Sequence, residues 1–347
     1  MAKKILLVQL RQLGDILLTT PSIREIKKQW PDASIDFLAH PMGKMILADN
    51  PHLNSIITYE TNANWIEQVR FLKKLRAQRY DIVLDFMYNP RSSLYSFATR
   101  APKRLAFSSR REFLFTDIVP QSKAVEYIVN EKFRYLKTLG LKPSDKTLDL
   151  PWNESHIRPT TEFLQRNPLF ANAKVRVAIS PTHRRAERQW PIERYAEIAD
   201  RLVRENKASV VWIWGPGEED LVRNAISLCK EPMLTAPKTS FRELAAFLAN
   251  CDLFIGNSNG PSHVAVANAQ SSLQLHGPTY ALAWCPKTLL HRAVQAAASS
   301  PEGRGPIGLI QVDEVWHALG DMWLEVESVA EKLRIFGIKS NWMQKCL

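Results

Sequence analysis

Short apolar runs alternate with amphipathic segments along the whole chain, and this alternation restricts the fold more than any other feature. Predicted strands cover residues 4–10, 34–40, 80–86, 175–181, 208–215, 252–256 and 272–277. Predicted helices cover residues 23–30, 65–78, 192–206, 218–230, 240–250 and 261–269. Because strands that alternate with helices form parallel sheets covered on both faces, we predict an α/β protein with doubly wound parallel sheets.

The chain is long enough for two domains, since it has 347 residues of which 45% are hydrophobic. We expect one domain over residues 1–155 and a second over 172–320. The segment around 150–174, which has three prolines and little apolar periodicity, is predicted to connect them. Residues 321–347 are predicted to form a helical tail, for which packing back across the hinge is one expectation.

Several classes of protein are excluded by missing motifs. The four cysteines form no CxxC pair, and no HxxxH or HExxH pair occurs, so we expect neither a metal site nor a disulfide framework. GxGxxG and the P-loop motif are also absent. No apolar run approaches the roughly 18–20 residues that span a bilayer, and the amino terminus does not match a signal peptide. We therefore predict a cytoplasmic protein.

Positive charge is concentrated in the first half. Residues 1–150 hold 24 Lys and Arg against 15 Asp and Glu, or +9, whereas residues 151–347 hold 22 against 20, or +2. A basic half favours an anionic partner, which could be nucleic acid, a membrane surface or a phosphorylated substrate. A solvated basic surface without a partner is the alternative. Nucleic acid is not expected, since no nucleic-acid-binding motif accompanies the charge.

A Gly-Asp pair, Gly14-Asp15, follows the first predicted strand. Ligands of doubly wound domains bind at the carboxyl ends of strands, where loops lead into helices. Gly14 would allow a sharp turn, and Asp15 would then project near a helix N-terminus. The simpler alternative is that Asp15 is only the N-cap of that helix.

Three further polar clusters follow predicted strands in the second half. Hydroxyls and cations between residues 180 and 191 suit a diphosphate, although a solvated basic loop is the alternative. A glutamate in "WGPGEED" could accept hydrogen bonds from a ribose or simply occupy the first turn of a helix. The segment "IGNSNGPSHVAVANA" resembles an open helix N-terminus that could bind phosphate, with a histidine that could equally lie in the core. The residues concerned are Thr182, His183, Arg188, Glu218, Ser258, Asn259, Gly260 and His263.

The order and spacing of these clusters resemble glycosyltransferase family 9, the bacterial heptosyltransferases of lipopolysaccharide core assembly. The resemblance runs through "ILLVQLRQLGDILLTTPSIREIKKQWPDASIDFL", "DFMYNPRSS", "RQWP", "GPGEE", "KTSFRELAAFLANCDLFIGNSNGPSHVAVA" and "LHGPT". It implies a GT-B architecture, in which two Rossmann-like domains face across a cleft. It also implies inverting transfer from a nucleotide-sugar on the second domain to an acceptor on the first, without an obligatory metal. ADP-heptose is the first expectation for the donor, and a lipopolysaccharide core or related glycan for the acceptor.

The resemblance also implies roles for individual residues. Asp15 becomes the general base, ionised at neutral pH if its pKa is near the reference of about 3.9. Gly14 and Arg91 become acceptor contacts. Arg188 occupies the position where the family often has lysine, and would offset charge on the departing diphosphate. Residues implied in donor binding are Thr182, His183, Arg188, Glu218 at the ribose, Lys238 and Thr239 near the base, and Ser258, Asn259, Gly260 and His263 at the phosphates.

One motif departs from the family pattern. The family usually reads Asp-Ser/Thr-Gly where this chain has Ser258-Asn259-Gly260, so a negative charge is missing from the implied donor site. This departure leaves open a non-catalytic binding module. A nucleotide-sugar 2-epimerase and a polysaccharide glycosyltransferase are the alternatives among enzymes.

The basic first half fits a phosphorylated lipid acceptor at the inner face of the cytoplasmic membrane. Cations that could contact anionic headgroups are Lys73, Lys74, Arg76, Lys103, Arg104, Arg110 and Arg111.

Overall fold

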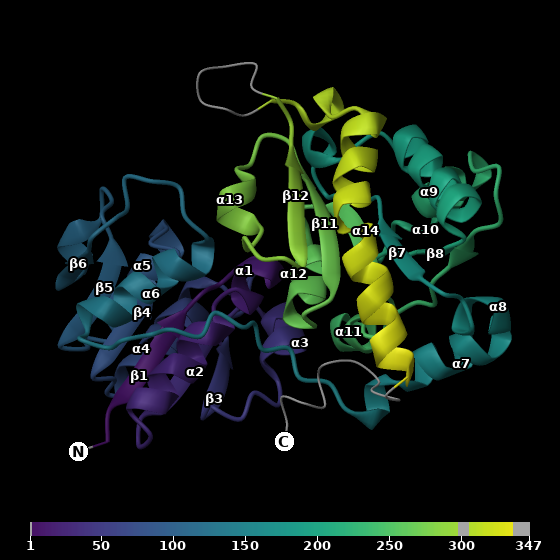
Figure 1. Cartoon of the computed structure of the whole chain (residues 1–347). Helices are drawn as coiled ribbons and strands as arrows, with labels where there is room; N and C mark the ends of the chain where they lie inside the picture. The colour runs from purple at the N-terminus through teal and green to yellow at the C-terminus, as the bar shows by residue number, and fades with distance from the viewer. Residues whose placement is uncertain (1, 298–304, 336–347) are drawn as a thin grey trace. The chain divides into compact units, whose positions relative to one another are not determined.

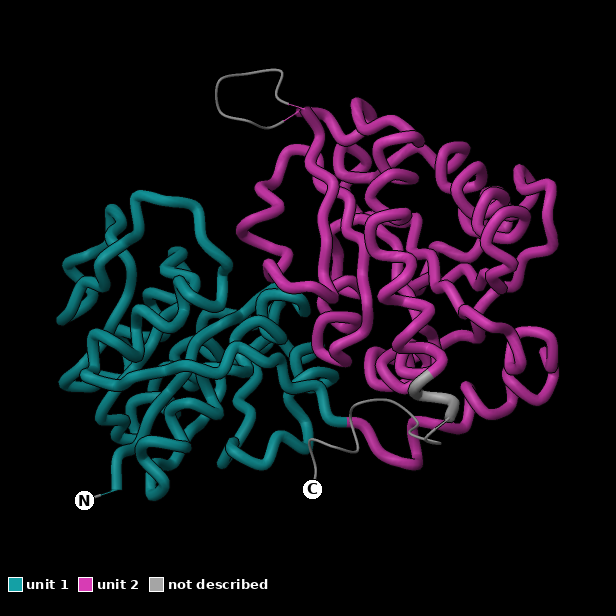
Figure 2. Tube along the Cα trace, in the orientation of Figure 1, with its two compact units in different colours: residues 1–151 teal, residues 152–347 magenta. Residues whose placement is uncertain are grey.

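The chain forms two compact units, divided after Pro151, and each is described by itself (Figure 2). A computed structural model describes residues 2–297 and 305–335. The division falls inside the predicted connection.

The first unit is built on a six-stranded sheet in the order β3-β2-β1-β4-β5-β6 (Figure 1). Every strand pair in it is parallel. Central strand β1 is buried from Ile5 to Val8, because helices cover both faces of the sheet. The strands are β1 (Lys4–Val8), β2 (Ser34–Ala39), β3 (Ser55–Thr58), β4 (Ile82–Asp85), β5 (Lys103–Phe107) and β6 (Asp117–Val119). The helices are α1 (Leu13–Leu17), α2 (Thr20–Gln29), α3 (Lys44–Leu47), α4 (Trp65–Ala77), α5 (Pro90–Ala98) and α6 (Ile128–Thr138).

The second unit repeats this plan in the order β12-β11-β10-β7-β8-β9, again with parallel pairs throughout. The strands are β7 (Arg176–Ser180), β8 (Ser209–Trp212), β9 (Leu234–Thr235), β10 (Leu253–Asn257), β11 (Ser271–His276) and β12 (His291–Gln295). The helices are α7 (Arg158–Arg166), α8 (Pro168–Ala171), α9 (Ile192–Asn206), α10 (Glu219–Ser227), α11 (Phe241–Leu248), α12 (Gly260–Ala267), α13 (Ala281–Trp284) and α14 (Val312–Ile335). The predicted α/β class with two doubly wound parallel sheets is confirmed.

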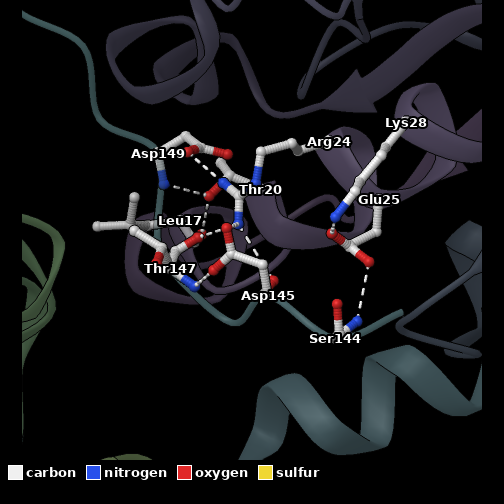
Figure 3. Close-up of polar contacts among 9 residues, drawn as sticks. All are labelled: Leu17, Thr20, Arg24, Glu25, Lys28, Ser144, Asp145, Thr147 and Asp149. Atoms are coloured by element: carbon white, nitrogen blue, oxygen red, sulfur yellow. Dashed lines mark hydrogen bonds and ion pairs between the residues drawn. The ribbon is translucent and has the colours of Figure 1, made fainter. Parts of the chain in front are cut away.

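Before it leaves the first unit, the chain runs along α2 and is fastened there by polar contacts (Figure 3). Arg24 forms an ion pair with Asp149 and donates to the carbonyl of Thr147 at 2.8 Å. The hydroxyl of Thr20 accepts a hydrogen bond from the backbone N–H of Asp149 and donates one to the carbonyl of Leu17, each at 2.8 Å. The exit of the chain is therefore tied to the end of α1.

Two features differ from the sequence prediction. The predicted connection contains two helices, α7 and α8, because Pro159 and Pro168 stand in their first turns, where proline is favoured. The C-terminal helix α14 begins at Val312, before the predicted tail, and buries Leu319, Met322 and other apolar residues in the core of its own unit. Residues 336–347 of the predicted tail lie outside the described residues.

Candidate active site

The polar residues singled out in the sequence follow the carboxyl ends of strands in both units. Each sheet has the order of a Rossmann fold, in which the crevice for a ligand opens between the first and fourth strands, where the strand order reverses. In the first unit Asp15 follows β1 and Arg91 follows β4, so the two flank this reversal. In the second unit the clusters follow the adjacent strands β10, β7, β8 and β9.

Asp15 is the third residue of helix α1, one turn past the N-cap, which is Gln12. Its Oδ2 accepts a hydrogen bond from the backbone N–H of Gln12 at 3.0 Å. The alternative of Asp15 as N-cap is therefore wrong. The sharp turn expected at Gly14 is also wrong, because Gly14 lies inside the helix with no positive φ. The bond at Oδ2 leaves Oδ1 available to a ligand.

A buried lysine that the sequence did not single out lies near Asp15 and contacts the segment before α1. Lys132, in the middle of α6, is 5% exposed, and its ammonium donates to Oε1 of Gln9 at 2.9 Å. The ammonium also lies 4.8 Å from the ring centre of Phe86. Burial lowers the pKa of Lys132 to about 8, although the negative charges of Asp15 and Glu131 act to raise it. Its signal in the sequence was its position, one residue before Phe133, on the buried face of an amphipathic helix.

The pKa of Asp15 is raised from its ordinary value by burial, which corrects the expectation of a reference value. The positive charge of Lys132 and the hydrogen bond from the Gln12 N–H both oppose this rise. Lys132 thus favours the ionised carboxylate, the form that can accept a proton.

Arg91 extends from the first turn of α5 and is exposed. Its guanidinium lies 5.3 Å from the ring centre of Tyr59, a cation–π distance. Asn89 caps the helix by accepting a hydrogen bond from the Ser92 N–H at 2.9 Å. The structure therefore presents Arg91 at the carboxyl edge of the first sheet, on the opposite side of the reversal from Asp15.

The loop that leads into α5 is held by a buried carboxyl group, that of Asp85 at the end of β4. Its Oδ1 accepts from the backbone N–H groups of Met87 at 3.0 Å and Tyr88 at 2.9 Å, and its Oδ2 from the Ser96 hydroxyl at 3.2 Å. Burial raises the pKa of Asp85 to about 6, although these hydrogen bonds act in the opposite direction.

In the second unit, Thr182 and Glu218 join the loops after β7 and β8. The Thr182 hydroxyl donates to Oε2 of Glu218 at 2.7 Å, and the same oxygen accepts from the Gly215 N–H at 2.8 Å. Glu218 is the N-cap of α10 and lies one residue before its first turn, where the alternative had placed it. Gly217, with φ of 84°, provides the left-handed turn before it. Both hydrogen bonds use Oε2, which leaves Oε1 for a ligand hydroxyl.

Arg188 closes a short 3-10 turn, Ala186–Arg188, after β7. It is half-buried, and its Nε has no hydrogen-bond partner among the described residues. Burial, and then the charge of Arg185, lower its pKa. Nearby His183 accepts a hydrogen bond at Nδ1 from the Arg185 N–H at 3.0 Å, and burial and the charge of Arg188 lower its pKa. The turn therefore holds cations next to a histidine that favours its neutral form.

Two asparagines at the end of β10 connect that strand to the loop after β7. Buried Asn257 accepts from the Trp190 N–H at 3.0 Å and donates to the Pro181 carbonyl at 2.8 Å. Asn259 caps α12 by accepting from the Ser262 N–H at 3.1 Å, and it donates to the Thr182 carbonyl at 2.9 Å. Asn259 thus caps α12 and holds the loop after β7, so its side-chain amide is already hydrogen-bonded within the protein.

Helix α12 offers a narrower phosphate site than its sequence suggested. Pro261 has no N–H, and the Ser262 N–H is already capped, so the N–H of Gly260 is the donor left in the first three positions of the helix. A Cβ at Gly260 would meet the Phe241 ring at 2.8 Å, so a larger residue here would have to displace that ring. Ser258 lies half-exposed just before the cap.

His263 is 4% exposed, and burial lowers its pKa to about 4, so the imidazole is neutral and lies in the core. Its ring centre lies 6.2 Å from that of Trp284.

Lys238 and Thr239 lie in the loop between β9 and α11, at the same edge of the second sheet. Lys238 is exposed, and Thr239 precedes Ser240, the N-cap of α11. No hydrogen bond among the described residues ties these two side chains to the Thr182–Glu218 pair. Within residues 2–297 and 305–335, no group of three His, Cys, Asp or Glu side chains gathers as it would around a metal ion.

Both the sequence and the fold are similar to those of known proteins. The sequence model of glycosyltransferase family 9 (heptosyltransferase) matches residues 68–303. Lipopolysaccharide heptosyltransferase 3 of Escherichia coli (strain K12) is 28% identical over 297 residues, which span 80% of this chain and 84% of that protein.

Solved structures of other proteins share the fold. A glycosyl transferase family 9 protein from Veillonella parvula DSM 2008 superposes with a TM-score of 0.83 at 21% identity, covering 93% of this chain and 98% of the other. E. coli heptosyltransferase WaaC with ADP-2-deoxy-2-fluoro heptose has a TM-score of 0.66 at 17% identity, covering 92% and 99%.

Proposed function

The chain belongs to glycosyltransferase family 9, and from this premise we propose that it is an inverting heptosyltransferase of lipopolysaccharide core assembly. The proposed donor is ADP-heptose, and the proposed acceptor is a phosphorylated lipopolysaccharide core or related glycan. The relative named above is a lipopolysaccharide heptosyltransferase, and a structural neighbour binds a fluorinated ADP-heptose. The reaction would take place in the cytoplasm.

In this proposal Asp15 removes a proton from the acceptor hydroxyl. The hydroxyl oxygen attacks the anomeric carbon of the heptose, the bond from that carbon to the diphosphate oxygen breaks, and ADP leaves. The proton passes to Oδ1 of Asp15, because Oδ2 accepts the Gln12 N–H. A positioned base of this kind typically contributes about 10²–10⁴-fold. Gly14 and exposed Arg91 are the proposed acceptor contacts.

The donor would bind at the carboxyl edge of the second sheet. Arg188 would hold the diphosphate and offset the charge that develops on ADP as it leaves. The free Oε1 of Glu218 would accept from a ribose hydroxyl, and Lys238 with Thr239 would lie near the base. The Gly260 N–H and Ser258 would support a phosphate, and Thr182, His183, Asn259 and buried His263 would hold the surrounding loops. No metal is required by this mechanism, and an unchanged rate in EDTA tests that point.

The observation that carries the proposal is the half-buried carboxylate of Asp15 at the strand-order reversal, with the buried ammonium of Lys132 behind it. Both belong to a chain whose family is shown by sequence. A structural cap alone would not need a buried cation, which costs free energy to desolvate.

The test is to incubate the purified protein with a panel of nucleotide-sugars, ADP-heptose included, with and without truncated lipopolysaccharide acceptors. ADP release from ADP-heptose that depends on the acceptor is the expected result. Release of nucleotide without acceptor would favour a 2-epimerase or a hydrolase instead. Neither binding nor release with any donor would favour a non-catalytic binding module, in which case the change at Ser258 would mark a lost activity.

A further inference from the structure

Helix α4 of the first unit presents an exposed face that nothing in the proposed chemistry uses. Trp65 is 75% exposed, Ile66 43% and Val69 41%, and these three apolar side chains lie in its first two turns. Large apolar side chains are rarely left together on a monomer's surface unless they contact a partner.

The following turns of the same helix are cationic. Arg70, Lys73 and Lys74 are exposed, and none of them forms an ion pair with another described residue. Over residues 65–79 the chain carries five Lys and Arg against one Glu, or +4. Apolar side chains with Trp, next to cations on the same exposed face, are typical of a helix that lies in the interface of an anionic membrane.

The opposite face of α4 is firmly packed, so the helix does not need to rearrange in order to bind. Leu75 is fully buried. The ring centres of Phe71 and Tyr95 lie 5.2 Å apart, and the Tyr95 hydroxyl donates to Oε1 of Gln68 at 3.4 Å. The exposed side chains can therefore be changed without disturbing the core.

The N-terminal, apolar end of α4 follows the carboxyl end of a strand of the first sheet, as Asp15 does. Helix α4 follows β3, which is two strands from β1 in the sheet, or about 10 Å at the usual spacing of neighbouring strands. Among the described residues of this unit, Met42 and Phe113 are also large apolar side chains more than half exposed, and both follow the carboxyl ends of strands.

Two of the arginines that were expected to contact headgroups donate hydrogen bonds to backbone carbonyls of their own unit instead. Arg104 donates to the Leu114 carbonyl at 3.0 Å, and Arg111 donates to the Tyr88 carbonyl at 3.1 Å. These two guanidinium groups are therefore less free to reach a headgroup than the exposed cations of α4, which are unpaired among the described residues.

We propose that α4 docks the protein on an anionic lipid bilayer, with Trp65, Ile66 and Val69 in the interface and Arg70, Lys73 and Lys74 against the headgroups. No helix in the described part of the chain is long and apolar enough to cross a membrane. The purpose of this docking, to bring a membrane-held acceptor to Asp15, rests on the proposed function. The binding itself does not, so vesicles without acceptor test it separately.

The experiment is co-sedimentation of the full chain with vesicles of phosphatidylcholine alone or mixed with phosphatidylglycerol. We expect binding to the anionic vesicles that weakens with salt, and little binding to the neutral ones. The triple variant R70E/K73E/K74E should lower the partition coefficient at least roughly tenfold, and W65S/V69S should lower it severalfold.

The matched control is K137E/K142E/K146E, which removes the same charge from exposed lysines elsewhere in the first unit. It should bind much as the unchanged protein does. Equal loss in both triple variants would overturn the proposal in favour of diffuse attraction. Wild-type binding by R70E/K73E/K74E, or by W65S/V69S, would also overturn it. Circular dichroism of each variant verifies that the fold is retained, and ADP release with a soluble truncated acceptor reports the proposed function independently.

Discussion

Lys132 donates a hydrogen bond from its buried ammonium to Oε1 of Gln9, 2.9 Å away, and so ties the middle of α6 to the segment between β1 and Asp15. The same charge lowers the pKa of Asp15 against the effect of burial. A single buried lysine thus both positions the segment before the proposed base and favours the base's ionised form.

Replacing Lys132 by methionine should move the acidic limb of the kcat/KM profile to higher pH. Burial raises the pKa of Asp15, and Lys132 and the Gln12 N–H lower it. Without the ammonium the pKa should rise further, so more of the carboxyl group stays protonated at a given acidic pH. We normalise each kcat/KM profile to its own plateau. On the acidic limb, the normalised kcat/KM of the variant should then be about three- to tenfold lower than that of the wild type. K137M, which alters an exposed lysine on the same helix, should leave the profile unchanged. Identical profiles for K132M and the wild type would contradict this role.

Arg188→Ala should lower kcat by about 10²–10³, as removal of one preorganised donor at a developing charge typically does. Arg188→Lys keeps the positive charge without the planar fork, and should retain an intermediate rate. The control is Arg184→Ala, which removes an exposed cation four residues away. An equal effect of R184A and R188A in steady-state assays would show that the loop acts only through its total charge.

Glu218→Gln should raise KM for the nucleotide-sugar about tenfold and leave kcat nearly unchanged, because a ribose contact persists equally in ground and transition states. The amide oxygen can keep the hydrogen bonds from Thr182 and Gly215, so the loop should hold its shape. Glu219→Gln, whose carboxylate pairs with Arg223 at the surface, serves as control. A fall in kcat without a change in KM would argue against a ribose contact.

Asp85→Asn should change how stability depends on pH. The pKa of Asp85 is raised to about 6 in the folded protein from an ordinary 3.8, so its stabilising contribution is complete below the ordinary value and is lost as pH rises through about 6. The amide of the variant can still accept from Met87 and Tyr88 but does not titrate. The Tm of D85N minus that of the wild type should therefore increase between pH 4 and pH 7. A difference that stays constant over this range would contradict the buried titration.

The central strands were predictable because they are continuous apolar runs, whereas the strands at or next to the sheet edges were not. β5, next to the edge of the first sheet, begins with Lys103 and Arg104. The edge strands of the second sheet are β12, which reads His-Arg-Ala-Val-Gln, and β9, which has two residues. Such segments lack the burial on both faces that gives a strand its apolar signature. Helix α7 was obscured for a different reason, since Pro159 indicates a linker as readily as a first turn.

The candidate site was predictable where a residue followed a predicted strand, as Asp15, Thr182 and Asn259 do. Sequence could not show which polar side chains were already committed within the protein. Asn259 fastens a loop, and His263 lies in the core, although the family resemblance implied phosphate binding for both. Lys132 was missed because its partner Gln9 is 123 residues away.

The most direct test of the account is acceptor-dependent ADP release by the wild type and by Asp15→Asn. The amide of the variant can still accept from the Gln12 N–H through its oxygen, so α1 should keep its cap while the base is lost. The account predicts a rate about 10²–10⁴-fold lower, with the affinity for ADP-heptose retained. A variant that releases ADP at the wild-type rate would show that Asp15 is only a capping residue and that the proposed mechanism is wrong.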